Sequence, residues 1–338
     1  MAEARPARIK AFLAAAGWGA AKRTKLPGDA SFRHYERLGD GARRALLMDA
    51  SPPEDVRPFV AIARHLTALG YSAPGILAED ADAGLLVLED LGDDTFTRLL
   101  EAGAEPAPLY QLAVDLLIDL HRRPLDAAAP AGLSRYDDTL FIGEAALLCD
   151  WYMPAVLGAE VAPASAREYR DLWRIALSKA RAVPETLVLR DYHVDNLMRV
   201  AGRDALAACG LLDFQDAVRG PVTYDLVSLL EDARRDVDAG LAARLRTRYL
   251  AAFPDLDQDD FARSLAILGA QRHAKVIGIF TRLLVRDGKP GYLRHIPRVW
   301  RLLEASCRHP ALTAITAWLD SHIPARARVV PEAPGGRP

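Results

Sequence analysis

A short polar stretch held between apolar runs constrains this chain more than any other part of its sequence. The run LVL at 187–189 is typical of a buried strand, the polar stretch RDYHVDN follows at 190–196, and apolar residues resume directly after it. A second apolar run ends at Asp213, 22 positions after Asp191. A short hairpin can bring both carboxylates into one site. The block at 186–220 therefore predicts a strand–loop–strand–strand platform for polar chemistry.

The first third of the chain and the remainder carry different periodicities. In the first third, short runs between turn residues predict strands, and one-sided apolar spacing predicts helices at 5–16 and 54–69. The predicted strands are 22–26, 32–38, 45–49 and 84–94. From about residue 95, apolar residues recur with helical spacing. The predicted helices there are 107–121, 139–153, 166–182, 223–235, 239–252, 259–285 and 291–305.

This order of elements predicts an α+β protein with two lobes. We expect a small N-terminal lobe with a sheet at residues 1–90, where a nucleotide would bind. A larger, mostly helical lobe at 91–325 would carry the catalytic and substrate-binding residues. The last residues, 326–338, are rich in proline, glycine and charge, and we predict a disordered tail there.

The charge balance argues against polyanionic partners. The 338 residues include 43 Lys and Arg against 45 Asp and Glu, so the net charge of −2 produces no field that would gather nucleic acid or an anionic membrane. The three cysteines are far apart and show neither a disulfide framework nor zinc-ligand spacing. Neither a signal peptide nor an apolar run long enough to cross a membrane is evident. We therefore expect a soluble, cytoplasmic monomer.

The polar stretch has the spacing of a kinase catalytic loop. Phosphoryl transfer uses a carboxylate that accepts the acceptor's proton and oxygen ligands that hold magnesium. Asp191 and Asn196 are separated by four residues, and Asp213-Phe214 stands where kinases place a metal-binding dipeptide, with Gln215 in place of Gly. The pattern predicts Asp191 as base, Asn196 and Asp213 as Mg²⁺ ligands, and ATP as donor. Alone, such Asp and Asn residues are usually turn or cap residues, but the flanking strands favour the catalytic interpretation.

Two segments of the first third could bind the nucleotide. In PGDASFR at 27–33, backbone amides and the Ser31 hydroxyl could cover phosphates, and Arg33 could reach one. An ordinary hairpin explains the same residues equally well. The apolar run LVLEDLG at 86–92 would leave the small lobe as a buried strand, and the backbone at Glu89 and Leu91 could bond an adenine edge.

Taken in order, these blocks resemble the aminoglycoside phosphotransferase and choline-kinase-like superfamily. The resemblance covers roughly residues 24–300 and includes Leu120-His121 at the end of a helix. More narrowly, the chain resembles the bacterial anomeric N-acetylmuramate/N-acetylglucosamine kinases. The stretches that carry this are GDASFRHY at 28–35, LLMDASPPED at 46–55, LVLEDLGDDTF at 86–96, RDYHVDNLM at 190–198, LLDFQDAVRGPVTYDLVSLLEDARRDV at 211–237 and RHAKVIGIFTRLLVRDGKPGYL at 272–293.

The resemblance implies a bilobal protein-kinase-like fold that uses ATP and Mg²⁺. It implies that the C1 hydroxyl of the amino sugar is phosphorylated in peptidoglycan recycling. By position, Asp191 would be the base, Asn196 and Asp213 the metal ligands, and the backbone at Glu89 and Leu91 the adenine contact. The loop residues Gly28, Ser31, Phe32 and Arg33 would lie over the phosphates.

The chain departs from the superfamily pattern at two places. Leu189 stands where the superfamily usually has a histidine two positions before the base, and we expect altered packing rather than lost catalysis. Met48-Asp49 stands where a small-lobe strand normally carries a phosphate-binding lysine. Arg33, Arg43 and Arg44 are the candidates for the missing cation.

The acceptor-binding residues are less well defined by the sequence. An amino sugar calls for short polar groups in an otherwise apolar pocket, and polar residues that flank the chemistry in sequence are His193, Asp195, Asp216, Arg219 and Tyr224. The helical half also offers Trp151, Tyr152, Arg272 and His273. An acidic set suits an aminoglycoside equally well: Asp213, Asp216, Asp225, Glu231 and Asp232. A solvated helix face explains most of these charges as well, so a kinase of another alcohol stays open as an alternative. A nucleotide-binding pseudokinase also stays open, because the missing small-lobe lysine and Leu189 favour it.

Overall fold

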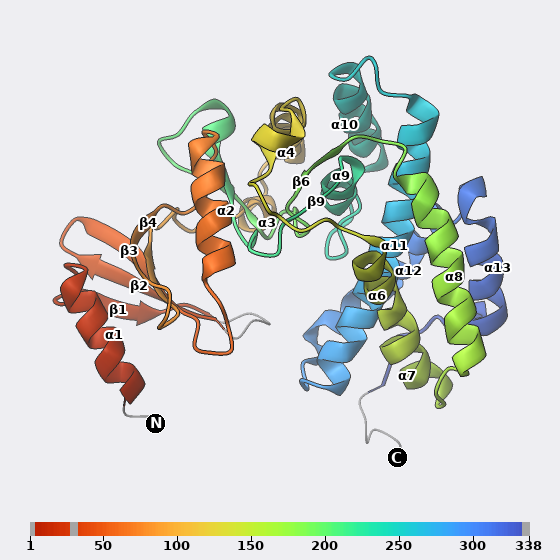
Figure 1. Cartoon of the computed structure of the whole chain (residues 1–338), viewed down its shortest axis with the longest axis horizontal. Coiled ribbons are helices and arrows are strands. Elements are labelled where there is room, and N and C mark those ends of the chain that lie inside the picture. Colours follow the sequence, from red (N-terminus) through yellow and green to blue (C-terminus); the bar gives the residue numbers. More distant parts are fainter. Residues whose placement is uncertain (1–3, 28–32, 333–338) are drawn as a thin grey trace. The chain divides into compact units, whose positions relative to one another are not determined.

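The computed structural model describes residues 4–27 and 33–332, which form two compact units (Figure 1). Unit 1 comprises the described residues of Met1–Leu116, Asp126–Ala131 and Val194–Ala217. Unit 2 comprises those of Leu117–Leu125, Gly132–His193 and Val218–Pro338. This division differs from the predicted boundary after residue 90, because the chain returns to unit 1 at Val194 and leaves it again after Ala217.

Unit 1 is built on an antiparallel sheet with the strand order β1-β2-β3-β5-β4. The strands are β1 (Lys22–Lys25), β2 (His34–Asp40), β3 (Arg43–Asp49), β4 (Ile76–Asp80) and β5 (Leu85–Leu88). Alternate residues of β3 and β5 point to opposite faces. Leu47 and Val87 pack against α1 (Ala4–Ala15), where they meet Leu13 and Trp18. Leu46 and Leu88, which are partners in register, face the other way.

Unit 1 also contains helices outside this sheet. They include α2 (Arg57–Ala68), α3 (Phe96–Glu101), the start of α4 (Pro106–His121) and most of α5 (Leu125–Ala128). The hairpin β7 (Leu197–Arg199) and β8 (Cys209–Leu211), with a 3-10 turn at Ala205–Ala208, belongs to the same unit. Phe59 of α2 stacks on Phe214 directly after β8, with ring centroids 4.9 Å apart. The segment Val194–Ala217 thus belongs to unit 1, and its Phe214 packs against α2.

Unit 2 is helical and is organised around the long helix α11 (Gln258–Val285), which packs against α6, α8, α9 and α12. The helices are α6 (Asp138–Leu147), α7 (Met153–Leu157), α8 (Pro163–Ala180), α9 (Thr223–Leu230), α10 (Ala239–Ala251), α12 (Ile296–Ser306) and α13 (Thr313–His322). Strands β6 (Glu185–Val188) and β9 (Val218–Pro221) form a two-stranded antiparallel sheet. The predicted α+β fold, with an N-terminal antiparallel sheet and a mostly helical remainder, is confirmed.

The predicted helices 139–153, 223–235 and 291–305 differ from the observed ones, and the last of these begins as a 3-10 turn at Pro290–His295 before α12. The predicted helix 139–153 is α6, a π-helical turn at Leu148–Tyr152 and α7, and Gly278 of α11 lies against Leu147 at the start of that turn. A Cβ on Gly278 would lie 2.3 Å from the Leu147 carbonyl carbon, so only glycine permits this approach. The predicted helix 223–235 ends at Leu230, because Glu231 leaves the helical conformation.

The stretch Asp138–Leu157 is long and apolar enough to cross a membrane by length and composition alone. Half of it is buried among the other helices of unit 2, and its residues Phe141, Ala145 and Tyr152 belong to the unit's core. Such burial is typical of a core helix.

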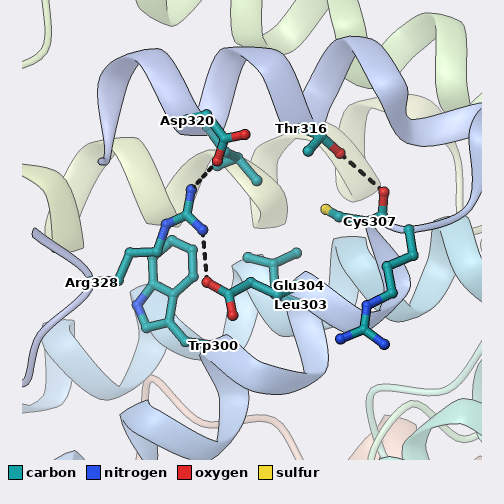
Figure 2. A pocket seen from close by; sticks show the side chains of 9 residues that line it. Trp300, Leu303, Glu304, Cys307, Thr316, Asp320 and Arg328 are labelled. Carbon is teal, nitrogen blue, oxygen red and sulfur yellow. Dashed lines mark hydrogen bonds and ion pairs between the residues drawn. The ribbon is translucent and has the colours of Figure 1, made fainter. Parts of the chain in front are cut away.

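The described part of the predicted tail, residues 326–332, is attached to unit 2. Arg328 pairs with Glu304 at 2.7 Å and with Asp320 at 2.5 Å, and its guanidinium lies over the Trp300 ring (Figure 2). The Tyr152 hydroxyl donates to the carbonyl of Val329 at 2.8 Å. Arg328 and its two carboxylate partners border a cavity of about 230 Å³. Arg328 of the tail is therefore held by partners on α12 and α13, which the local composition did not indicate.

Candidate active site

Unit 1 contains a cavity of about 350 Å³ that suits a nucleotide. The sheet contributes Leu46 and Leu88, α2 contributes Phe59, and the β7–β8 hairpin contributes Met198 and Leu212. These side chains make an apolar slot, while polar groups line the rest of the cavity. An apolar slot with a few polar groups is the usual form of a small-molecule site.

Asn196 and Asp213 meet in the lining of this cavity because two short strands pair. Asn196 directly precedes β7 and Asp213 follows β8, and Leu197 pairs with Leu211 in the hairpin. The Asn196 Nδ2 lies 3.4 Å from the Asp213 Oδ2. Asp213 has a positive φ of 57°, a conformation that few residues with side chains adopt. The predicted metal ligands are thus neighbours at one place in unit 1.

The donor set of this pair fits Mg²⁺. Magnesium prefers oxygen ligands and is usually held by one or two carboxylates together with substrate phosphates and water. Asp213 offers a carboxylate, and the Asn196 amide offers an oxygen. No group of three or more His, Cys, Asp or Glu side chains arranged for a metal occurs within the described ranges. A cation here would therefore take most of its ligands from a nucleotide and from water.

The segment after β5 also lines the cavity, through Glu89, Leu91 and Asp93. The Glu89 backbone N–H already donates to the Gly75 carbonyl at 2.8 Å. The Glu89 side chain pairs with Arg203. A base that bonds this segment would therefore use carbonyl groups or the backbone at Leu91 rather than the N–H of Glu89.

The cations that line the cavity differ from those expected. Gly28, Ser31 and Phe32 lie outside the described residues. Arg33 pairs with Glu54 at 3.3 Å, and Arg43 pairs with Asp40 and stacks on Trp18 on the α1 side of the sheet. Among the described residues, the cations of the lining are Arg37 and Arg98.

Arg37 is held by carboxylates of the segment after β5. Its guanidinium lies 2.7 Å from Asp90 and 3.0 Å from Asp93. The hydrogen bond from Arg37 lowers the pKa of the Asp93 carboxyl below its usual range. Arg37 was missed by sequence reasoning because an arginine on a strand is common and has no motif around it.

Asp191 belongs to unit 2, where it follows β6 on a turn of unusual backbone geometry. Arg190, directly before it, has a φ of 71°. The backbone N–H groups of Leu189 and Arg190 donate to the two oxygens of Asp225 at 2.6 and 2.9 Å. Asp225 lies on α9 and is fully buried. Helix α9 therefore holds the turn that presents Asp191.

Cationic side chains surround Asp191. Arg272 of α11 lies 3.8 Å from the Asp191 carboxylate, and Lys275 is one turn further along the helix. Burial alone would raise the pKa of the Asp191 carboxyl, but Lys275, Arg272, His193 and Arg190 lower it to about 2. Because 38% of the Asp191 side-chain surface is exposed, water still solvates part of the carboxylate. The Asp191 carboxyl is therefore ionised at neutral pH and accessible to solvent.

The residues predicted to bind the acceptor are divided between the units. Asp195 and Asp216 belong to unit 1, where Asp195 lines the cavity and accepts a hydrogen bond from Thr97. His193, Arg219 and Tyr224 belong to unit 2 with Asp191.

Within unit 2, these three have different environments. The His193 Nε2 lies 3.3 Å from Arg234. Arg219 is half-buried and pairs through its backbone with Tyr136 and Ser134. Tyr224 is fully buried, and its hydroxyl oxygen lies 3.0 Å from the Tyr136 hydroxyl oxygen. Of these three residues, His193 is the nearest to Asp191 in sequence, whereas Tyr224 is part of the core of unit 2.

The four further acceptor candidates of the helical half are also mostly buried. Tyr152 donates to the tail, and Trp151 lies half-buried on the π-helical turn. His273 is buried, with its Nε2 3.6 Å from a Glu231 oxygen. Only Arg272 of this set lies against the predicted base.

The sequence matches the phosphotransferase enzyme family over residues 22–264, well over half of the chain. The chain belongs to this family. Two members are similar to it along nearly their whole length. The N-acetylmuramate/N-acetylglucosamine kinase of Caulobacter vibrioides is 39% identical, over 96% of this chain and 98% of the relative. The protein of the same name from Pseudomonas aeruginosa is 38% identical over 91% of each chain.

Solved structures of phosphotransferases share the fold. A choline/ethanolamine kinase family protein from Mesorhizobium loti has a TM-score of 0.61 and 17% identity, over 95% of this chain and 99% of that chain. This phosphotransferase therefore has the predicted protein-kinase-like fold of the superfamily.

Two residues near the predicted base were not assigned by sequence reasoning. Lys275 and Glu144 form a 3.0 Å ion pair close to the predicted base. One signal was present in the sequence, because Arg272 and Lys275 are cations in a helical run that is mostly apolar. Their partner on α6 has no motif, so the pairing could be found only from the fold.

Proposed function

We propose that this phosphotransferase uses ATP and Mg²⁺ to phosphorylate the C1 hydroxyl of N-acetylmuramate and N-acetylglucosamine. The observation that carries the proposal is the likeness to four curated relatives of this name, at 35–39% identity over most of the chain. The sugar 1-phosphate would serve peptidoglycan recycling, and the enzyme would act as a soluble cytoplasmic monomer.

We assign nucleotide and Mg²⁺ binding to unit 1 and the catalytic base to unit 2. The apolar slot of unit 1 would hold the adenine, and Asn196 with Asp213 would hold Mg²⁺. When bound, the ion neutralises charge on the phosphates. Asp191 would orient the acceptor hydroxyl and accept its proton as the bond to phosphorus forms. A carboxylate with a low pKa suits a late proton transfer, since it is ionised whenever the acceptor binds.

The charge around the base favours a neutral or anionic acceptor. Arg190, Arg272 and Lys275 all act on Asp191. The acidic set that could suit an aminoglycoside is partly structural, because Asp225 is fully buried and binds backbone N–H groups. Arg272 would repel a polycationic acceptor and attract the carboxylate of N-acetylmuramate, whereas Arg190 and Lys275 contribute less because both pair with Glu144.

Phosphorus NMR of the products tests the proposal. Purified protein with ATP and Mg²⁺ would be offered N-acetylmuramate, N-acetylglucosamine, choline and an aminoglycoside in separate reactions. We expect a sugar 1-phosphate signal from the two amino sugars only. Products from choline or the aminoglycoside alone, or phosphate at another sugar position, would contradict the proposal.

A pair of variants assigns the base. We predict that Asp191→Asn lowers kcat about 10²–10⁴-fold while the affinity for ATP stays near that of the wild type. Asp171→Asn on the exposed face of α8 is the matched control and should keep full activity. Unchanged turnover in Asp191→Asn would remove that residue from the role of base.

A further inference from the structure

The residue before the predicted base has a backbone that suits glycine. The φ of Arg190 is 71°, in the left-handed region where side chains clash with the backbone. Glycine would adopt this turn without strain. Strained residues persist where surrounding contacts over-determine them, and they gather at functional sites. The contacts of Arg190 therefore indicate what the turn is for.

The side chain of Arg190 belongs to a buried ion cluster. Its guanidinium pairs with Glu144 of α6 and lies over the Tyr136 ring, 5.4 Å from the ring centre. Glu144 also contacts Lys275 at 3.0 Å and accepts a hydrogen bond from the Tyr136 hydroxyl. Breaking a buried ion pair leaves an uncompensated charge, so this cluster holds the arginine side chain firmly.

The backbone of Arg190 is held on both sides. Its N–H donates to Asp225, and its carbonyl accepts a hydrogen bond from Arg272 Nη1 at 2.9 Å. The other terminal nitrogen of Arg272 lies 3.8 Å from the Asp191 carboxylate. Arg272 is 4% exposed and lies in the middle of α11, so one rigid guanidinium spans the turn and the base.

We propose that Arg272 and Arg190 are positioning residues for Asp191. Arg272 holds the carboxylate and the preceding carbonyl in one arrangement, and Arg190 keeps the left-handed turn closed through its ion pair with Glu144. This inference rests on the proposed function, because it takes Asp191 as the base. A misplacement of about 1 Å at a reacting group can reduce a rate about 10²-fold, so loss of either arginine affects kcat.

Replacing Arg272 tests the first half of the proposal. We expect Arg272→Gln to lower kcat with an amino sugar about 10²-fold while the KM for ATP changes less than about threefold. Arg272→Lys keeps the positive charge but has one terminal nitrogen in place of two. Its kcat should therefore lie between that of the wild type and that of the Gln variant. Arg263→Gln on the same helix, where Arg263 pairs locally with Asp260, is the matched control.

The pH dependence separates positioning from mere stability. Asp191 faces Arg272 and Lys275 of α11, Arg190 and His193 of its own loop, and Asp225 of α9. Removing the Arg272 charge raises the pKa of Asp191 from about 2 toward its ordinary value near 3.9, while Lys275, His193 and Arg190 still lower it. The acid limb of kcat/KM should therefore enter the measurable range in Arg272→Gln. A fold defect alone would lower the active fraction without moving this limb.

Replacing Arg190 by glycine tests the second half. Arg190→Gly relieves the backbone strain but removes the guanidinium, and we expect at least a tenfold loss of kcat. Ala205 is another left-handed residue with a φ of 48°, in unit 1, so Ala205→Gly relieves comparable strain away from the base. That control should keep full activity. Should Arg190→Gly fail to fold, Arg190→Asn provides the same comparison, because asparagine tolerates the left-handed region and carries no charge.

The outcomes separate this inference from the proposed function. Absence of sugar phosphorylation by the wild type would defeat the proposed function and, with it, the role of Asp191. The wild type could be active while folded Arg272→Gln or Arg272→Lys keeps full activity and an unshifted acid limb. That result overturns the role of Arg272 and leaves the proposed function intact. Full activity of folded Arg190→Gly or Arg190→Asn overturns the role of Arg190 in the same way.

Discussion

Replacing Asp225 by alanine should destabilise unit 2 strongly. The two oxygens of Asp225 accept the backbone N–H groups of Leu189 and Arg190 at 2.6 and 2.9 Å, and the residue is fully buried. Alanine leaves both donors buried without an acceptor, at about 1–3 kcal/mol each. The expected loss at pH 5 is therefore about 2–6 kcal/mol, a large part of the roughly 5–15 kcal/mol that holds a domain folded.

This loss should shrink as the pH rises. Burial raises the pKa of Asp225 from 3.8 to about 7, although the two backbone hydrogen bonds act in the opposite direction. Because the folded pKa lies above the unfolded one, the wild type is stabilised below about pH 4. It then loses up to about 1.4 kcal/mol per pH unit as the pH rises toward 7. The alanine variant lacks this dependence, so the two unfolding free energies approach each other between pH 5 and pH 8.

Urea unfolding followed by tryptophan fluorescence measures the effect, since four of the five tryptophans lie in unit 2. Ser228→Ala is the matched control on the same helix. Ser228 is equally buried, and its hydroxyl has no hydrogen-bond partner within the described residues, so its removal should be nearly neutral. An Asp225→Ala variant within about 0.5 kcal/mol of Ser228→Ala at pH 5 would refute the reasoning.

Two further predictions concern metal binding and packing. Asp213→Ala should abolish Mg²⁺-dependent ATP binding in calorimetry, since it removes the carboxylate of the predicted ion site, whereas Asp204→Ala on the surface of unit 1 should bind normally. Wild-type affinity in the first variant would contradict the assignment. Gly278→Ala should cost about 1–3 kcal/mol in urea unfolding, because its Cβ would lie 2.3 Å from the Leu147 backbone. Gly143→Ala on α6, with nothing within 4 Å, should be neutral or slightly stabilising, and equal effects of the two changes would exclude the packing argument.

Local sequence was sufficient for the pieces of the site that one motif contains. Asn196 and Asp213 were predicted as a metal pair, and pairing of β7 with β8 brings them together in the lining of one cavity. Strand pairing depends on nearby residues in a short hairpin, so the sequence pattern is informative there. Their function as ligands stays a prediction.

Local sequence was insufficient where neighbours come from distant segments. The predicted helix 139–153 is broken by a π-helical turn at which Gly278 of α11 approaches Leu147. The tail residue Arg328 was expected to be disordered, yet it finds carboxylates on α12 and α13. Both outcomes depend on tertiary packing, which overrides local periodicity and composition.

The sequence by itself determined the family, the α+β class and the identity of the predicted base and metal ligands, because these depend on spacings within short blocks. Only the tertiary structure decided which charges face Asp191. Arg272 is 81 positions from it, and Glu144 precedes it by 47. Coulomb interactions act through space, so the charge environment of that carboxylate is set by how α6, α9 and α11 pack around it.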